Sequence, residues 1–261
     1  MKARFANGLA IGLLAISIAR PAPATDLEGT LSVRGDLPNP PEERGRYYWQ
    51  AENGVLPTRR PRLDLDRDVA VALHGPAPAG ALQTVVVRMI DGGLRPAAIV
   101  VRPGTLVRFE NNDTFAHELY IPNPASPLGQ DWFRAEATSR GSTRDVRFTQ
   151  EGIFEIRCRR APHLRAWIAV ENVTTTVTPD VEGKFAFDDV APGNYRLRVF
   201  HGGVWIGEKA IEVEDGRTQE VEMSATLPAV PPPGATAAPG ATAAPAATAA
   251  PASAAPATAG P

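Results

Sequence analysis

Cysteine is almost absent from this chain: Cys158 is the one cysteine among 261 residues, so an internal disulfide is excluded. Methionine and histidine are also scarce, with three and four copies. These counts limit the sulfur and imidazole groups that could bind a metal ion. Two interpretations of Cys158 therefore stay open. It either holds a metal ion, or it is what remains of a site that once did.

The chain also lacks an apolar run long enough to span a bilayer, which takes roughly 18 residues. The longest apolar stretch, residues 9–19, follows two cations, and the small residues Ala22 and Ala24 precede the expected cleavage position. This pattern is typical of a secretory signal peptide. We therefore predict that residues 1–24 are a leader and that the protein is periplasmic or secreted, with no membrane span.

Positive charge is not in excess. The 27 basic and 29 acidic residues give a net charge of -2, and removal of Lys2, Arg4 and Arg20 with the leader leaves 24 against 29, a net charge of -5. Nucleic-acid-binding proteins normally present a basic face. Nucleic acid is therefore excluded as an expected partner.

Charged and aromatic residues are missing altogether from residues 228–261, where GATAAP-like units repeat. Such a tract has no side chains with which to build a core, and its prolines favour an extended chain. We predict a disordered tail over this range. It serves either as a spacer through a cell envelope or as a solvated tail without a specific role.

The part of the chain between leader and tail is rich in short segments of β-branched and aromatic residues, separated by Gly, Pro, Asn and Asp. Many segments alternate in polarity, as residues 106–109 do, which is typical of half-buried antiparallel strands. No amphipathic helix of ordinary length is visible. The predicted class is all-β, with sandwiches whose cores lie between two sheets.

Residues 81–171 contain two separated motifs in a recognisable order. The first is LRPAAIVVRPGTLVRFENNDTFAHELY, which ends just after His117, and the second is EGIFEIRC, which ends at Cys158. The first motif contains Pro103-Gly104, Phe109, Asn111 and Asp113. Together the motifs resemble the cupredoxin family, the β-sandwich class of plastocyanin and azurin. The resemblance implies a Greek-key sandwich with His117 and Cys158 at copper-binding positions.

The loop after Cys158 departs from the family pattern. A blue-copper site needs a thiolate and two imidazoles, usually with a weak axial thioether. The exported cupredoxin-like proteins that this chain most resembles read Cys-x-x-His-Pro-x-Met-Arg-Ala, whereas this loop has Ala161 and Leu164 at the histidine and methionine positions. Neither side chain can bind a metal ion. In azurin-type loops the second histidine comes five residues after the cysteine, which is the position of His163 here.

Two hypotheses for the cofactor follow. The first is a degenerate site that holds none, and the second is copper bound by His117, Cys158 and His163. Arg157, Arg159 and Arg160 surround the cysteine in sequence. We expect their positive charge to lower the pKa of the thiol and to disfavour a metal cation beside it.

Residues 172–227 carry another pattern, with a Gly183 turn, a Pro192-Gly193 turn and aromatic residues that can share a core, among them Phe185 and Tyr195. The pattern resembles the carboxypeptidase-regulatory-like or transthyretin-like (prealbumin-like) sandwich, whose modules are usually structural or adhesive. Residues 25–80 contain GTLSVRG and DVAVALHG, which resemble the first two strands of that family. This N-terminal β segment therefore either stands apart or completes a discontinuous second sandwich.

No Ser/His/Asp arrangement, phosphate loop or second metal cluster is visible in the sequence, so a non-enzymatic protein is predicted. The function favoured by the loop is a binding or structural role in the cell envelope, with an envelope protein or a polysaccharide as partner. The alternative is a mononuclear copper protein for electron transfer or copper handling, which would need a redox partner.

Overall fold

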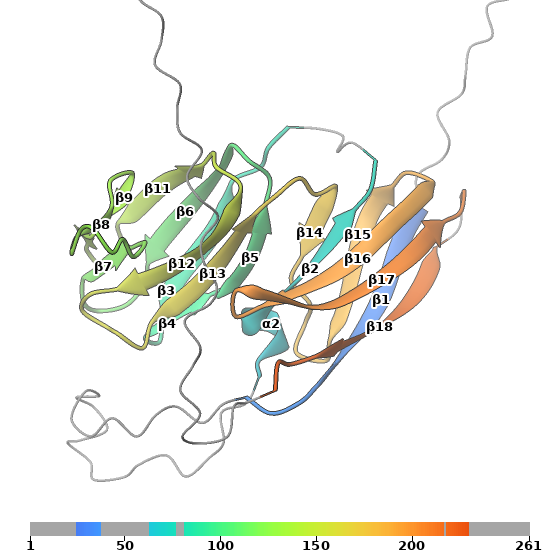
Figure 1. Ribbon diagram of the computed structural model, residues 1–261, viewed down its shortest axis with the longest axis horizontal. Helices are drawn as coiled ribbons and strands as arrows, with labels where there is room; N and C mark the ends of the chain where they lie inside the picture. The colour runs from blue at the N-terminus through green and yellow to red at the C-terminus, as the bar shows by residue number, and fades with distance from the viewer. Residues whose placement is uncertain (1–24, 38–62, 77–80, 217, 230–261) are drawn as a thin grey trace, which may run out of the picture. The chain divides into compact units, whose positions relative to one another are not determined.

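The computed structural model describes residues 25–37, 63–76, 81–216 and 218–229 (Figure 1). The predicted leader and nearly all of the predicted tail lie outside these ranges. Apart from one four-residue helix, α2 (Leu65–Asp68), the regular elements are strands, which confirms the predicted all-β class. In the described part of the chain, no helix has the length and apolar character needed to cross a membrane.

The first sandwich is built from a five-stranded sheet in the order β10-β7-β12-β13-β5 and a four-stranded sheet in the order β11-β6-β3-β4, with a small β8-β9 pair beside them. Its strands are β3 (Val85–Ile90), β4 (Gly93–Arg95), β5 (Ala98–Val101), β6 (Thr105–Asn111), β7 (His117–Tyr120), β8 (Gly129–Gln130), β9 (Phe133–Arg134), β10 (Glu136–Thr138), β11 (Thr143–Phe148), β12 (Gly152–Cys158) and β13 (Arg165–Val170).

The core of this sandwich follows from the alternation seen in the sequence. Along β6 every second residue is buried, so that Val107 and Phe109 face the opposite sheet. The fully buried ring of Phe109 stacks on Phe133 with ring centroids 5.5 Å apart. Both sheets are mixed, because β5 pairs in parallel with β13 and β3 pairs in parallel with β6.

The second sandwich is built from a three-stranded sheet in the order β15-β1-β18 and a four-stranded sheet in the order β14-β2-β16-β17. Its strands are β1 (Thr25–Arg34), β2 (Val69–His74), β14 (Thr175–Val177), β15 (Lys184–Val190), β16 (Gly193–His201), β17 (Val204–Val213) and β18 (Gln219–Thr226).

Segments far apart in the sequence meet in this second sandwich. In Figure 1 the blue strand β1 lies beside the orange-red strand β18, and the two pair in parallel from Leu27 with Gln219 to Arg34 with Thr226. Strand β2 lies between β14 and β16. One hydrophobic core therefore contains side chains from before and after the first sandwich, such as Leu27, Leu73 and Leu197.

Candidate functional site

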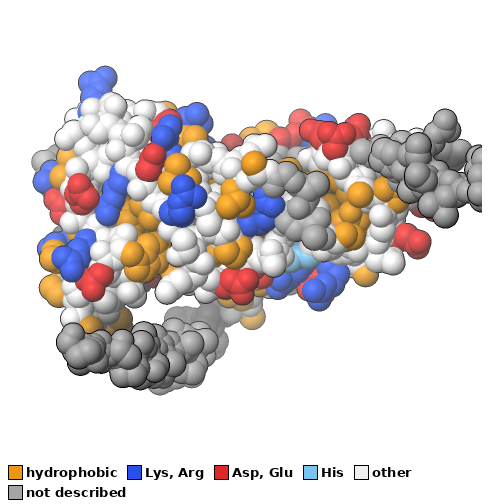
Figure 2. Space-filling view, turned by 90° about the horizontal axis from the view of Figure 1, so that it is seen from above, with side chains coloured by type: hydrophobic (Ala, Val, Ile, Leu, Met, Phe, Trp, Pro, Cys, Tyr) orange, Lys and Arg blue, Asp and Glu red, His pale blue; other side chains and the backbone are white. Residues whose placement is uncertain are grey.

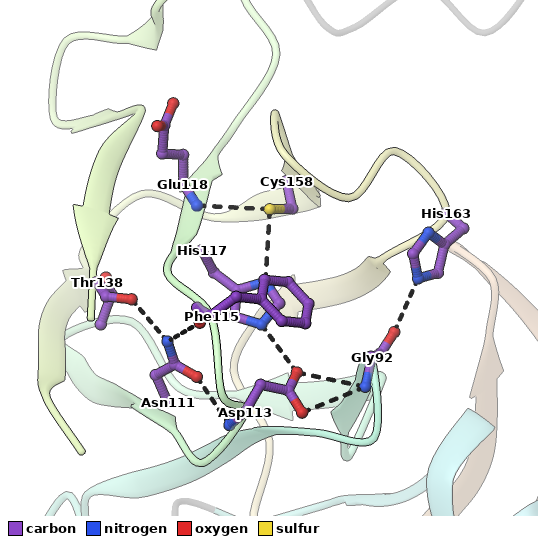
Figure 3. A network of polar contacts seen from close by, with 9 residues as sticks. All are labelled: Gly92, Asn111, Asp113, Phe115, His117, Glu118, Thr138, Cys158 and His163. Atoms are coloured by element: carbon purple, nitrogen blue, oxygen red, sulfur yellow. Dashed lines mark hydrogen bonds and ion pairs between the residues drawn. The ribbon is translucent and has the colours of Figure 1, made fainter. Parts of the chain in front are cut away.

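Two neighbouring strands of the five-stranded sheet bring His117 and Cys158 together. Strands β7 and β12 are antiparallel, with Leu119 opposite Cys158. Because His117 begins β7 and Cys158 ends β12, the two side chains lie at the same end of the sheet (Figure 3). Both are buried, with 0% and 2% of their surface exposed.

The His117 ring connects a thiol and a carboxylate. Its Nδ1 lies 3.6 Å from Cys158 Sγ, and its Nε2 lies 2.8 Å from Asp113 Oδ2 (Figure 3). We assign the Nε2 proton to the bond with the carboxylate, which leaves the Nδ1 lone pair of a neutral ring directed at the sulfur. The backbone N–H of Glu118 also donates to Sγ, over 3.4 Å.

The Asn-x-Asp motif of the sequence holds the loop that precedes His117. The amide of Asn111 donates to the carbonyls of Phe115 and Thr138, at 2.9 and 2.7 Å, and its oxygen accepts the N–H of Asp113 at 2.9 Å. Asp113 is thereby placed to accept from His117. The motif therefore orients His117 in two ways: Asn111 holds the loop that precedes the ring, and Asp113 accepts a hydrogen bond from it.

Hydrogen bonding shifts the pKa values of both buried groups. Burial acts to lower the pKa of His117, but the hydrogen bonds with Cys158 and Asp113 outweigh it and raise that pKa above its usual value. Burial acts to raise the pKa of Cys158, but the bond with His117 and backbone N–H groups, including that of Glu118, lower it. Each group thus favours the charged form of the other.

His163, the third predicted ligand, is not part of this pair. Its Nε2 donates to the carbonyl of Gly92 over 3.1 Å (Figure 3). Ala161 and Leu164 lie in the same core cluster as Cys158, with 0% and 1% of their surface exposed. Across the residues described here, no group of three or more His, Cys, Asp or Glu side chains is arranged to hold a metal ion.

The fit to copper is therefore incomplete. A metal that binds one sulfur at about 2.3 Å and one nitrogen at about 2.0 Å in tetrahedral geometry separates the two atoms by about 3.6 Å. The distance between Cys158 Sγ and His117 Nδ1 is 3.6 Å, so these two groups meet the requirement. The trigonal His₂Cys set also needs a second imidazole, and the position expected for it by the family pattern is the methyl group of Ala161.

The arginines beside Cys158 form ion pairs and do not act on the thiol as the sequence suggested. Arg157 forms an ion pair with Glu155 at 2.6 Å, and Arg160 forms one with Glu118 at 2.7 Å. The lowering of the Cys158 pKa comes from His117 and backbone N–H groups, not from arginine side chains. The pKa of the thiol is lowered as expected, but through His117 and backbone N–H groups, because Glu155 of the same strand and Glu118 of the neighbouring strand β7 neutralise two of these guanidinium groups.

Two residues of the site were missed from the sequence. Gly92 donates its N–H to Asp113 and offers its carbonyl to His163, and Phe115 packs on the His117 ring with centroids 4.5 Å apart. Phe115 is 41% exposed and so separates His117 from solvent. The Asp-Gly-Gly run at 91–93, typical of a tight turn between strands, was the available signal for Gly92.

The two sheets built from β3 to β13 form a sandwich of cupredoxin-like fold, with the histidine–cysteine pair buried at one end. Among solved structures, the chain is similar to the reduced Cu(I) form of a proline-to-glycine mutant of amicyanin at pH 4, with a TM-score of 0.31 and 18% identity over 39% of this chain and 98% of that chain. It is also similar to an oxidized methionine-to-leucine mutant of amicyanin, with a TM-score of 0.31 and 20% identity over 39% and 98%.

For the second sandwich, the sequence model of polysaccharide lyase family 4, domain II, matches residues 174–221. The carboxypeptidase-regulatory-like assignment of residues 172–227 is not confirmed by this match. The comparison with curated proteins finds no match.

Acidification should destabilise the fold through His163. Burial lowers the pKa of His163, the Gly92 carbonyl opposes this, and the charge of His117 lowers it further, so the net shift is downward. Below about pH 6.5 the unfolded chain takes up a proton at this residue before the folded chain does, so stability falls as the pH falls towards the folded-state pKa. His163→Gln, which keeps an N–H donor, should reduce this loss of stability at low pH. The measurement is the free energy of unfolding in urea at a series of pH values. A steeper loss in the variant would contradict the assignment.

Proposed function

We propose that this chain is an exported, non-enzymatic envelope protein whose cupredoxin-like sandwich works without copper, in a binding or structural role. The observation that carries the proposal is the loop after Cys158. Ala161 and Leu164 are buried where the family pattern has a histidine and a methionine. Neither side chain offers a lone pair to a metal ion.

The polar network supports the same proposal, because its members already bind one another. His117 is engaged through both ring nitrogens, by Cys158 and by Asp113, and His163 donates to Gly92. A metal ion would have to displace the contact between His117 and Cys158 and draw His163 away from its carbonyl. The network therefore serves as a buried polar anchor for the loops at this end of the sandwich.

A polysaccharide or an envelope protein is the partner that fits this role. The match of residues 174–221 to domain II of a polysaccharide lyase family supports the first. A carboxypeptidase-regulatory-like module over 172–227 would serve equally as a non-catalytic surface. Figure 2 shows basic and acidic side chains interspersed over the visible face, which suits a partner without strong net charge.

Titration of the protein with Cu(II), followed by visible absorption spectroscopy, tests the proposal. We expect no intense thiolate-to-copper band and no stoichiometric binding, because within the described ranges only Cys158 Sγ and His117 Nδ1 are placed for the ion. A saturable band at one equivalent would overturn the metal-free proposal.

A mononuclear copper protein for electron transfer or copper handling is the second candidate. The separation of 3.6 Å between His117 Nδ1 and Cys158 Sγ favours it, since two ligands of one metal ion have this spacing. His163 would have to leave Gly92 and supply the second imidazole, with a redox partner outside the chain. In that case both Cys158→Ser and His163→Ala would abolish the copper band.

A further inference from the structure

A polar pocket of about 560 Å³ lies at the end of strand β2, away from the histidine–cysteine pair. Its volume is within the range of about 300–1,000 Å³ that small-molecule sites occupy. Most such sites are mainly apolar, whereas this one is lined largely by side chains that form hydrogen bonds. The polar lining residues are His74, Asn172, Asn194, Arg196 and Glu212.

Strand register explains why these side chains share one face. Arg196 of β16 lies opposite His74 of β2 on one side and opposite Ala210 of β17 on the other. Asn194, two residues earlier in β16, lies opposite Glu212 and therefore projects to the same face. The small side chain of Ala210 between longer neighbours leaves the depression.

Gly75 closes the inner side of the pocket. A Cβ atom at this residue would overlap the ring of Tyr195, so glycine allows the end of β2 to lie directly over that ring. Tyr195 is itself fixed, because it is 3% exposed and its hydroxyl donates to the carbonyl of Ala191 over 2.8 Å. The pocket is therefore a rigid feature of the sandwich.

His74 is the buried member of the polar lining. The residue is 9% exposed, and its Nε2 makes no hydrogen bond to any residue that the structure describes. The nearest carboxylate oxygen, on Glu171, is 3.4 Å away. Burial, together with the charges of Arg198 and Arg196, lowers the pKa of His74, so the ring is neutral at pH 7. Nε2 of His74 is enclosed beside Glu171, so the groups that a ligand can reach are the exposed side chains of Asn172, Asn194, Arg196 and Glu212.

The charges that line the pocket decide which ligand fits. Arg196 is a donor, and its ion-pair partner Glu208 is 3.9 Å away. Glu212 is an acceptor of opposite charge in the same lining. With a neutral His74 the lining carries no net charge. The two asparagines both donate and accept, as vicinal hydroxyl groups do. An anionic ligand would meet Glu212, and a cationic one would meet Arg196.

We infer that this pocket binds a neutral saccharide unit, whose hydroxyl groups pair with the amides of Asn172 and Asn194 and with the charged groups of Arg196 and Glu212. The inference rests on the proposed binding role and names a ligand class for it.

Calorimetric titration of the full chain with maltotriose, cellotriose and galactotriose tests the inference, with trigalacturonate as the anionic comparison. At least one neutral trisaccharide should bind with a Kd below about 1 mM. Asn194→Ala and Glu212→Gln should each weaken it about tenfold, the loss expected for one hydrogen bond to a charged or buried group. Glu182→Gln is the matched control, because Glu182 is an exposed carboxylate of the same sandwich outside the pocket.

Circular dichroism should show that both variants keep the fold. The inference is overturned if no neutral trisaccharide binds, if binding is unchanged in both variants, or if trigalacturonate binds more tightly than the neutral probes. The copper titration tests the proposed function independently of this inference. A protein without a copper band and without saccharide binding would retain the metal-free role with a protein partner, whereas a copper band would remove that role whatever the pocket binds.

Discussion

Replacing Ala161 with histidine and Leu164 with methionine is expected to turn a colourless protein into one that binds a single Cu(II) ion with an intense thiolate-to-copper absorption band. The two substitutions supply the imidazole and the thioether that the family pattern places after the cysteine. His117 and Cys158 already lie 3.6 Å apart, so half of the site is present. The measurement is visible absorption during a Cu(II) titration, beside the unchanged protein.

Leu164→Met alone is the control, because methionine replaces leucine with little change in volume and adds no strong ligand. It should stay colourless. Adding Cys158→Ser to the double variant should remove the band. Ala161 is fully buried, so the larger imidazole is expected to cost about 1–3 kcal/mol of apo-protein stability. A folded double variant without a copper band would show that the loop backbone, not its side chains, prevents binding.

Gly183→Ala is expected to destabilise the second sandwich by about 3 kcal/mol. Gly183 has φ +85°, and a Cβ atom there would overlap the backbone carbonyl oxygen of Leu31. The glycine carbonyl also accepts the N–H of Leu31 over 2.7 Å, so the turn before β15 is joined directly to β1. The left-handed conformation costs an alanine about 1–2 kcal/mol, and a disturbed backbone hydrogen bond adds about 1 kcal/mol.

Gly141→Ala is the matched control for that prediction. Gly141 has φ +75° but no atom within 4 Å of the added Cβ, so only the conformational cost of about 1–2 kcal/mol applies. Urea unfolding followed by circular dichroism compares the two variants. Equal losses would show that conformation alone matters at Gly183, and that its contact with β1 contributes nothing to stability.

The histidine–cysteine pair could be predicted because each residue belongs to a sequence motif at a strand end. His117 follows the Asn-x-Asp loop and Cys158 ends a strand of alternating polarity, and neighbouring strands then place them side by side. The place of His163 could not be predicted in this way. Its partner is the carbonyl of Gly92, which lies 71 residues earlier in the chain. A count of residues after the cysteine contains no information on such a contact.

The all-β class could be predicted from the sequence alone, because alternating polarity and frequent turn residues specify strands locally. The sequence also determined which chemical groups the loop after Cys158 can offer. The pairing of β1 with β18, the ion pair of Arg160 with Glu118, and the face shared by His74 and Glu212 all depend on the tertiary structure. The physical reason is common to all three. Strand pairing and ion pairing depend on residues distant in the chain, whose proximity is set by packing of the whole core and not by local preference.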